Sequence, residues 1–261
     1  MGLILTDSSA YQVSIPVFDF DELDSTSSEA MRRAARGERG PIWIRAVRQS
    51  RGRGRSGRSW AMLEGNLAAS LLFEPGCPPG ALHQLSLLAG VAIHDALHIL
   101  VDTSGDPLRA RLKWPNDLMI GASKVGGILV ESSTFEGRLV AVVGVGINVA
   151  AAPAIPGRAT TALVAHCRDI PAPEELLHAI DRRFRAWLRA WDEGAGFEAV
   201  RSAWLERGLR IGEPLTINER HGLVSGSFAG LDDDGALLMR TGEGLIERFA
   251  TGDVSLVDAG N

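Results

Sequence analysis

Residues 48–60 read RQSRGRGRSGRSW, a segment with five arginines separated by glycine and serine. The chain has 261 residues and a formal net charge of −5, so this segment is far more basic than its background. Its neighbours on either side, residues 42–48 and 66–73, are short apolar runs of the kind that form strands. The pattern therefore predicts a basic loop between two buried strands.

The glycines of this loop satisfy the pattern G-x-G-x-x-G at Gly52, Gly54 and Gly57. That pattern binds a dinucleotide only where a strand precedes it and a helix follows, because the helix N-terminus holds the pyrophosphate. A strand does precede it, but residues 59–73 read as a loop and then a strand. A Rossmann-type dinucleotide site is therefore disfavoured.

Three other interpretations of the loop remain. A nucleic-acid arm would use the arginines as phosphate contacts, but the chain is acidic overall and the segment offers one aromatic residue, Trp60, for stacking. A solvated surface loop is the plainest alternative. The favoured interpretation is a mobile loop that closes over an anionic small molecule. Glycines let the backbone approach the ligand, and arginines neutralise carboxylate and phosphate oxygens.

Composition places the chain among ordinary globular proteins, with 45% hydrophobic and 23% charged residues. Since no apolar run approaches the ~20 residues that span a bilayer, we expect no membrane partner. Cys77 and Cys167 are too few for a disulfide framework, which fits a reducing compartment. These features predict a cytoplasmic protein.

The basic residues are unevenly distributed between the two types. Of 27 in the chain, arginine supplies 25 and lysine only two, Lys113 and Lys124. Arginine presents a planar fork of donors, whereas lysine presents a compact ammonium group. In a chain that otherwise uses arginine, these two positions are predicted to need the ammonium.

Three further motifs carry chemistry. In KWPNDL, Asn116 and Asp117 can offer oxygens to Mg²⁺, although Pro-Asn-Asp is also ordinary turn chemistry. KVGGILVE begins with Lys124, just before a glycine pair and a buried strand, a position suited to holding a carboxylate at the mouth of a pocket. In GVGINV at 144–149, glycine at alternate strand positions leaves one face bare, which makes room for a flat ligand. A bulge or close packing would have the same signature.

Hydrophobic periodicity and turn residues predict the order of the elements. A helix opened by a capping box of Thr26 and Glu29 is expected at 26–37, and others at 81–101, 173–193 and 196–207. Strands are expected at 13–20, 42–48, 66–73, 109–113, 117–120, 124–133 and 138–147. After Gly208, short β segments separated by turns predict a small barrel or sandwich, so a domain boundary is placed near residue 208.

Taken together, five stretches resemble the biotin protein ligase family in their order and spacing. They are DSTSS at 24–28, RQSRGRGRSGRSW at 48–60, KWPNDL at 113–118, KVGGILVE at 124–131 and GVGINV at 144–149. The likeness covers about residues 15–261. It implies an α+β fold, with a mixed-sheet catalytic domain and flanking helices over 1–208 and a small SH3-like β-barrel over 209–261.

The resemblance also implies an activity. Members of the family use ATP and Mg²⁺ to activate biotin as biotinyl-5′-AMP, then transfer biotin to one lysine of a biotin carboxyl carrier protein. A ligase for lipoate or octanoate is the alternative, since it activates a carboxylate in the same way. The family motifs begin by residue 24, which leaves no room for the DNA-binding domain of some relatives, so no DNA partner is expected. A homodimer is left open.

Residue by residue, the family pattern implies three sets of contacts. The catalytic set is Lys124, Arg53 and Arg55. The biotin-binding set is Ser25, Thr26, Ser27, Gln49, Arg53, Gly54, Arg55, Lys124, Gly127 and Gly144. The set for ATP or the adenylate is Gly52, Arg53, Arg55, Trp60, Lys113, Asn116, Asp117 and Asn148, with magnesium reaching Asn116 and Asp117 through ATP.

The chain departs from the family pattern at three positions within these motifs. Ser27 stands where asparagine is usual, which puts one polar contact near the biotin head in doubt. Ser59 stands where lysine is frequent, and Arg51 stands where a small residue is common. The family pattern does not require Arg51, and nothing in the sequence explains it.

Overall fold

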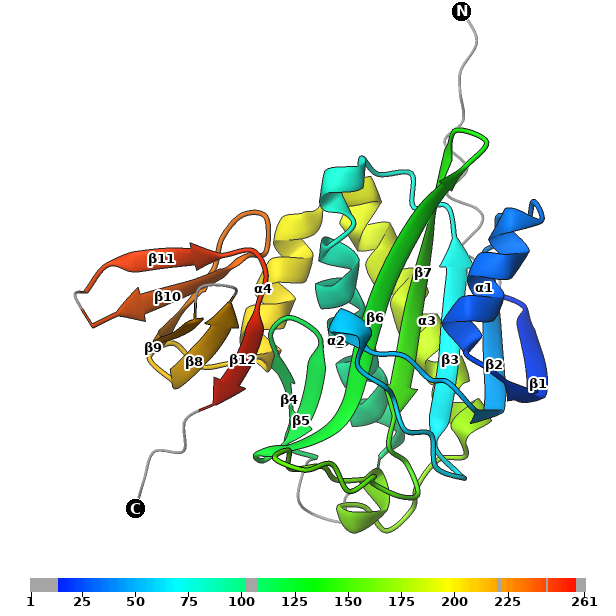
Figure 1. Ribbon diagram of the computed structural model, residues 1–261, viewed down its shortest axis with the longest axis horizontal. Coiled ribbons are helices and arrows are strands. Elements are labelled where there is room, and N and C mark those ends of the chain that lie inside the picture. Colours follow the sequence, from blue (N-terminus) through cyan, green and yellow to red (C-terminus); the bar gives the residue numbers. More distant parts are fainter. Residues whose placement is uncertain (1–13, 102–107, 220–221, 243, 257–261) are drawn as a thin grey trace, which may run out of the picture.

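The computed structural model describes residues 14–101, 108–219, 222–242 and 244–256 of the chain. Within these residues, a seven-stranded mixed sheet packs against helices, and a separate five-stranded antiparallel sheet lies at its side (Figure 1). The expected α+β architecture is confirmed. Among the described residues, no helix is both long and apolar enough to cross a membrane.

The larger sheet has the strand order β1-β2-β3-β7-β6-β5-β4. Only β1 and β2 run parallel, and helix α1 (Thr26–Ala35) connects them. The strands are β1 (Val17–Leu23), β2 (Ile42–Gln49), β3 (Leu67–Phe73), β4 (Ala110–Lys113), β5 (Asp117–Ile120), β6 (Ser123–Phe135) and β7 (Arg138–Ile147).

The first strand is displaced from its expected range of 13–20. It starts at Val17, immediately after Pro16, because proline has no N–H to donate to a β ladder. The Pro16 carbonyl still accepts a hydrogen bond from the Trp43 amide at 2.8 Å. Residue 13 lies outside the described residues.

The helices divide between the two faces of this sheet (Figure 1). One face is covered by α2 (Gln84–Leu100), α3 (Pro173–Trp191) and α4 (Phe197–Arg207). Helix α1 packs on the opposite face, against β2, β3 and β7. Residues 50–60, which we call the arginine loop, cross that same face in front of β6 (Figure 1).

Strand β7 shows how side-chain alternation builds both faces. Val143, Val145 and Ile147 point into the large core beneath α2 and α3. The alternate residues Val140 and Val142 point the other way, into a smaller cluster beneath α1. Gly144 and Gly146 continue this second row, so the face is bare where the row of valines ends.

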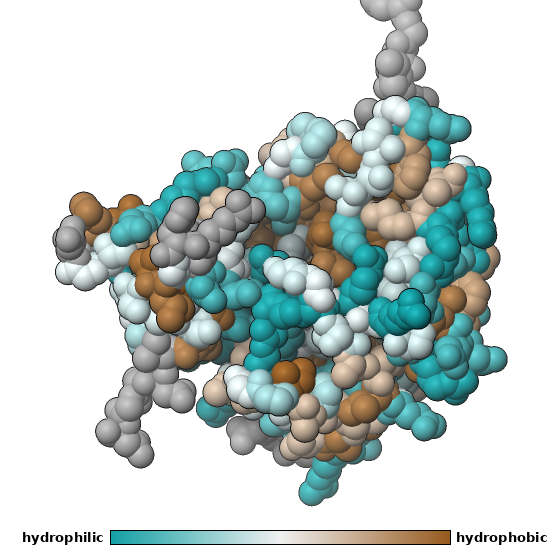
Figure 2. All heavy atoms as spheres, viewed as in Figure 1, coloured by the Kyte–Doolittle hydropathy of each residue, from teal (hydrophilic) through white to brown (hydrophobic). Residues whose placement is uncertain are grey.

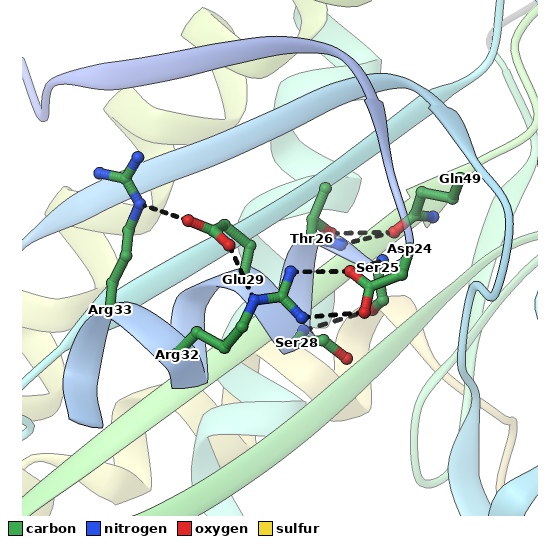
Figure 3. Close-up of polar contacts among 8 residues, drawn as sticks. All are labelled: Asp24, Ser25, Thr26, Ser28, Glu29, Arg32, Arg33 and Gln49. Atoms are coloured by element: carbon green, nitrogen blue, oxygen red, sulfur yellow. Dashed lines mark hydrogen bonds and ion pairs between the residues drawn. The ribbon is translucent and has the colours of Figure 1, made fainter. Parts of the chain in front are cut away.

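The N-cap of helix α1 lies one residue before the expected position. The N-cap is Ser25, whose hydroxyl accepts a hydrogen bond from the Ser28 amide at 3.4 Å, so the predicted capping box of Thr26 and Glu29 is wrong. Glu29 instead pairs with Arg32 at 2.9 Å and Arg33 at 3.0 Å (Figure 3). The Thr26 hydroxyl is engaged elsewhere, at one end of the cavity.

The second sheet has the order β11-β10-β9-β8-β12. Its strands are β8 (Pro214–Glu219), β9 (Gly222–Leu231), β10 (Leu237–Thr241), β11 (Ile246–Phe249) and β12 (Asp253–Leu256). It is anchored to the larger sheet by an ion pair between Arg111 of β4 and Glu213. Strand β12 lies on the side nearest the larger sheet (Figure 1).

A half-buried carboxylate joins the three helices on the far face. Asp95 of α2 accepts hydrogen bonds from the Trp187 indole of α3 at 3.0 Å and from Arg207 of α4 at 2.8 Å. Burial alone would raise the pKa of Asp95, but contacts from His94, Trp187 and Arg207 outweigh it and lower the pKa to about 2. The ionised carboxylate is therefore a structural element of the helical layer.

We expect Asp95 to make part of the stability dependent on pH in acid. Because the folded pKa of about 2 lies below the ordinary 3.8, the stabilisation is complete above pH 3.8 and is lost as the pH falls toward 2. Its size is roughly 2 kcal/mol. Chemical unfolding should show a smaller loss of stability across this range in Asp95→Asn than in the wild type. Asp233→Asn, at a fully exposed side chain, should leave the pH profile unchanged.

Candidate active site

A cavity of about 490 Å³ opens on the face of the large sheet that carries α1. Its walls come from the start of α1, the arginine loop, β5 and β6, residues 153–160, and β12 of the second sheet. Hydrophilic side chains gather across the middle of this face (Figure 2). Segments far apart in the sequence therefore meet around one space.

The floor of the cavity is made of small residues. Ala68, Gly127, Gly144 and Gly146 lie on adjacent strands β3, β6 and β7. A Cβ atom at Gly146 would lie 2.5 Å from the Trp60 ring, and one at Gly144 would lie 2.8 Å from the Ser27 hydroxyl. Both positions must therefore be glycine for these neighbours to stay in place, and the bare face predicted from GVGINV is confirmed.

One end of the cavity carries hydroxyl and amide groups from the start of α1. The side-chain oxygen of Gln49 accepts hydrogen bonds from the Thr26 amide at 2.8 Å and its hydroxyl at 3.2 Å (Figure 3). Behind them, the buried Ser70 hydroxyl lies 2.8 Å from that of Thr26 and 3.0 Å from that of Ser27. The sequence prediction missed Ser70, although a hydroxyl in the apolar run LAASLLF was a usable signal.

The middle of the cavity holds both lysines of the chain. Asp117 accepts a contact from Lys124 through one oxygen and an ion pair from Lys113 at 3.0 Å through the other. Burial would raise the pKa of Asp117, but the charges of Lys124 and Lys113 hold it below its ordinary value. Burial lowers the pKa of Lys124, and Asp117 opposes that shift.

The arginine loop folds over this cluster. Arg55 donates to the Asn116 side-chain oxygen at 3.2 Å, and Arg53 pairs with Glu131 of β6 at 2.8 Å. Burial lowers the pKa of Arg55, yet a guanidinium group stays charged at neutral pH. Trp60, at the end of the loop, has its ring 5.7 Å from the Lys124 ammonium. After the three-residue turn Arg55–Gly57 the chain continues as a loop and then as strand β3, and the helix N-terminus that a dinucleotide site needs does not follow the glycines directly.

The second sheet supplies a wall that the sequence prediction missed. Asp253 of β12 pairs with Arg58 at 2.7 Å, and the Gly252 carbonyl lies 3.5 Å from two nitrogens of Arg55. Lys113 donates to the Val254 carbonyl at 3.0 Å. No local pattern in GDVSL indicates this, because the contacts depend on how the two sheets pack.

A second missed wall is formed by residues 153–160, which line the cavity beside Lys124. The Lys124 amide donates to the Ala159 carbonyl at 2.9 Å, and its carbonyl accepts from the Thr161 amide at 2.9 Å. The side chain of Asn148 lies beneath this segment and donates to the Thr161 carbonyl at 3.0 Å. Its Oδ1 atom is buried with no hydrogen-bond partner among the described residues.

All the residues predicted for the site except Gly52 line this one cavity. Gly52 is a buried residue of the loop itself, and its carbonyl accepts a hydrogen bond from the Trp60 amide at 2.9 Å. A Cβ atom there would lie 2.4 Å from the Trp60 carbonyl oxygen, so this glycine is needed for the path of the loop. Its predicted contact with the adenylate stays a prediction.

The residues implied for magnesium have their oxygens engaged. Arg55 occupies the side-chain oxygen of Asn116, and the two lysines occupy both oxygens of Asp117. Among the described residues, no three His, Cys, Asp or Glu side chains are grouped to hold a metal ion. This arrangement does not fit a magnesium ion held by the protein, so we derive no step through one.

Two family models match the chain. Residues 24–148 match the biotin/lipoate A/B protein ligase family, and residues 211–257 match the biotin protein ligase C terminal domain. The chain is 38% identical to the biotin–[acetyl-CoA-carboxylase] ligase of Paracoccus denitrificans, over 83% of this chain and 91% of that protein. It is 31% identical to the bifunctional ligase/repressor BirA of Bacillus subtilis, over 90% of this chain and 72% of that protein.

Solved structures agree with these matches. The biotin protein ligase from Aquifex aeolicus in complex with biotin and ATP superposes with a TM-score of 0.76 at 29% identity. The match covers 93% of this chain and 98% of that one, including both sheets. The fold and the site thus define an enzyme of the biotin/lipoate ligase class. The chain belongs to the biotin protein ligase family.

We expect the pair of Arg58 and Asp253 to hold the arginine loop against β12. Asp253→Asn or Arg58→Asp should speed amide hydrogen exchange of residues 53–60 by up to about fivefold, since an exposed ion pair contributes up to ~1 kcal/mol. The exchanged pair, Arg58→Asp with Asp253→Arg, should restore part of the protection. Glu22→Gln, which removes an exposed pair with Arg48 outside the cavity, is the control. Equal exchange in the exchanged pair and the single variants would contradict this role.

Proposed function

We propose that the chain is an ATP-dependent biotin protein ligase, which joins biotin to AMP and then transfers it to one lysine of a biotin carboxyl carrier protein. The observation that carries the proposal is one cavity with a hydroxyl-rich end, a bare floor and a cluster of cations. The Paracoccus denitrificans relative is named as a ligase for acetyl-CoA carboxylase, and the Aquifex aeolicus structure is a complex with biotin and ATP.

The first half-reaction brings two anions together. A carboxylate oxygen of biotin attacks the α-phosphorus of ATP, and the bond from that phosphorus to the pyrophosphate oxygen breaks. Preorganised cations lower the cost of this encounter because they need no reorganisation when charge develops. The cations in the middle of the cavity would neutralise the carboxylate and the phosphate. They are Lys113, Lys124 and Arg55. Arg53, paired with Glu131 at the edge of the loop, is a further cation for the same task.

The hydroxyl-rich end suits the ureido ring of biotin. That ring presents two N–H donors and a carbonyl acceptor, and Ser25, Thr26, Ser27 and Gln49 bring both kinds of partner to the cavity. Ser70 holds the hydroxyls of Thr26 and Ser27 from behind, so it is a positioning residue. The glycine floor then leaves room for the fused rings to lie against the sheet.

The opposite end suits the nucleotide. The buried Oδ1 atom of Asn148 is an acceptor without a partner among the described residues, and the exocyclic amine of adenine is a fitting donor. Trp60 offers a flat surface for stacking on the base. Gly54 lets the loop backbone approach the phosphates, and magnesium would enter with those phosphates, which is how it is usually bound.

The second half-reaction is an acyl transfer. The neutral amine of the acceptor lysine attacks the carbonyl carbon of biotinyl-5′-AMP, the bond from that carbon to the phosphate oxygen breaks, and the attacking nitrogen loses a proton as AMP leaves. Lys124 and Arg55 would stabilise the oxygen charge that develops in this step. Because the arginine loop covers the cations, it would also keep water from the mixed anhydride.

A lipoate or octanoate ligase is the second candidate, because one matching family model covers both kinds of ligase. The polar end of the cavity favours biotin. The ring of lipoate has no N–H donors and its sulfurs are weak acceptors, so the groups of Ser25, Thr26 and Gln49 would be left without good partners.

The proposed function is tested by biotin-dependent exchange of labelled pyrophosphate into ATP with purified full-length protein. Exchange with biotin but not with lipoate is the expected result. Exchange with lipoate alone would select the second candidate, and no exchange from folded protein with either acid would exclude both. Incubation with an acetyl-CoA carboxylase carrier domain then tests the transfer step.

We expect Arg55→Gly to fold normally but to lose biotinyl-5′-AMP faster. The variant removes a charge-assisted contact worth about 1.5–3 kcal/mol, so release should accelerate roughly tenfold to a hundredfold. Release of the labelled intermediate from preloaded protein measures this. Arg48→Ala, in β2 just before the arginine loop, outside the cavity and exposed, should retain the intermediate like the wild type. Equal retention in Arg55→Gly would remove this arginine from the site.

The remaining features of the proposal come from the sequence alone. A cytoplasmic location, a possible homodimer and the absence of a DNA partner stay predictions. The individual roles of the cavity residues are also proposals, and substitution of one residue at a time would test each role.

A further inference from the structure

One ion pair lies directly beside the hydroxyl-rich end of the cavity, although neither of its residues lines the cavity. Arg32, about two turns along α1, donates to both carboxylate oxygens of Asp24 at 2.8 Å each (Figure 3). One of these oxygens also accepts a hydrogen bond from the Ser25 amide at 2.7 Å. The contact with Arg32 is the main cause that lowers the pKa of Asp24 to about 2, so the pair is ionised at neutral pH.

The main chain of Asp24 holds the start of the arginine loop. The Asp24 carbonyl accepts a hydrogen bond from the Arg51 amide at 2.8 Å, and the neighbouring Leu23 carbonyl accepts one from the Ser50 amide at 3.0 Å. Asp24 is therefore held by α1 through its side chain and holds the loop through its backbone.

The connection that contains Asp24 is very short. Only Asp24 and Ser25 separate the end of β1 at Leu23 from the start of α1 at Thr26. So short a segment has few backbone angles with which to absorb a movement. A shift of Asp24 would therefore be passed on to the first turn of α1, where Ser25, Thr26 and Ser27 line the cavity, and to the first residues of the arginine loop.

We propose that Arg32 is a positioning residue of the ligase reaction, which acts through Asp24 on both the hydroxyl-rich end and the start of the arginine loop. The inference rests on the proposed function and concerns the biotin half of the cavity. The nucleotide end is built by other segments, among them Asn148 and residues 153–160. Loss of the pair should therefore weaken the hold on biotin and biotinyl-5′-AMP more than the hold on ATP.

The next residue on the same helix offers a matched control. Arg33 pairs with Glu29 at 3.0 Å, and its guanidinium lies 4.4 Å from the centre of the Phe18 ring. Arg32 also pairs with Glu29, at 2.9 Å, but among the described residues only Arg32 pairs with Asp24. Arg33→Ala and Glu29→Gln thus remove contacts of α1 and leave the pair with Asp24 in place.

The test measures biotin-dependent pyrophosphate exchange and the release of labelled biotinyl-5′-AMP from preloaded full-length protein. We expect Arg32→Ala to raise the KM for biotin and the release rate roughly twofold to fivefold, as befits a half-exposed ion pair. The KM for ATP should change less than the KM for biotin. Arg32→Lys should give intermediate values, because an ammonium group does not reproduce the two parallel hydrogen bonds of the guanidinium. Arg33→Ala and Glu29→Gln should match the wild type.

A double-mutant cycle tests whether Arg32 acts through Asp24. Asp24→Asn should reproduce the effects of Arg32→Ala, and the double variant should be no worse than the more affected single one. Amide hydrogen exchange at Arg51, measured without ligand, should be faster in Arg32→Ala than in Arg33→Ala. A purely structural role would instead lower Tm without separating the KM for biotin from the KM for ATP.

The proposal is overturned if folded Arg32→Ala keeps the wild-type KM for biotin, or if Arg33→Ala raises that KM equally. Additive effects in the double variant would also overturn it, because Arg32 would then act by another route. Should Arg32→Ala fail to fold, Asp24→Asn carries the same expectations and decides. Failure of the proposed function is a different result, seen as absent pyrophosphate exchange in the wild type itself.

Discussion

The alternation of side chains along β7 is the constraint on which the site depends. The strand is central, so one row of its residues must fill the core beneath α2 and α3. The opposite row packs beneath α1 as far as Val142 and then becomes glycine. Any side chain at Gly144 or Gly146 would displace Ser27 or Trp60. The cavity thus exists because residue size falls from valine to glycine along one face of a continuous strand.

The charges are arranged on this floor in a way that limits the cost of burial. A buried carboxylate is expensive unless its oxygens are paired, and Asp117 has an ammonium on each. The cations in turn need a partner while no anionic ligand is bound, because like charges would otherwise repel across a small space. Asp117 supplies that partner to both lysines.

The small C-terminal sheet forms part of the cavity wall and contacts the residues of the site directly. Lys113 reaches the Val254 carbonyl, and the arginine loop reaches Asp253 and Gly252 through two of its arginines. The closing loop is therefore held from both sides, by β6 through Glu131 and by β12. A shift of the second sheet would therefore move Lys113 and the arginines of the loop, even if the larger sheet stayed in place.

The sequence by itself determined the order of the helices and strands and which residues form the motifs of the site. Periodicity located α1 to α4 and most of the strands closely, and every residue named from the five family stretches lines the cavity, Gly52 excepted. Tertiary structure alone decided the cap of α1, the support from Ser70 and the wall formed by β12. The reason is physical: local patterns record burial and turn chemistry, whereas the partner of a hydroxyl or a charge is chosen by whichever distant segment packs beside it. Thr26 illustrates this, since Ser70 and Gln49 hold the hydroxyl that a local pattern had assigned to a cap.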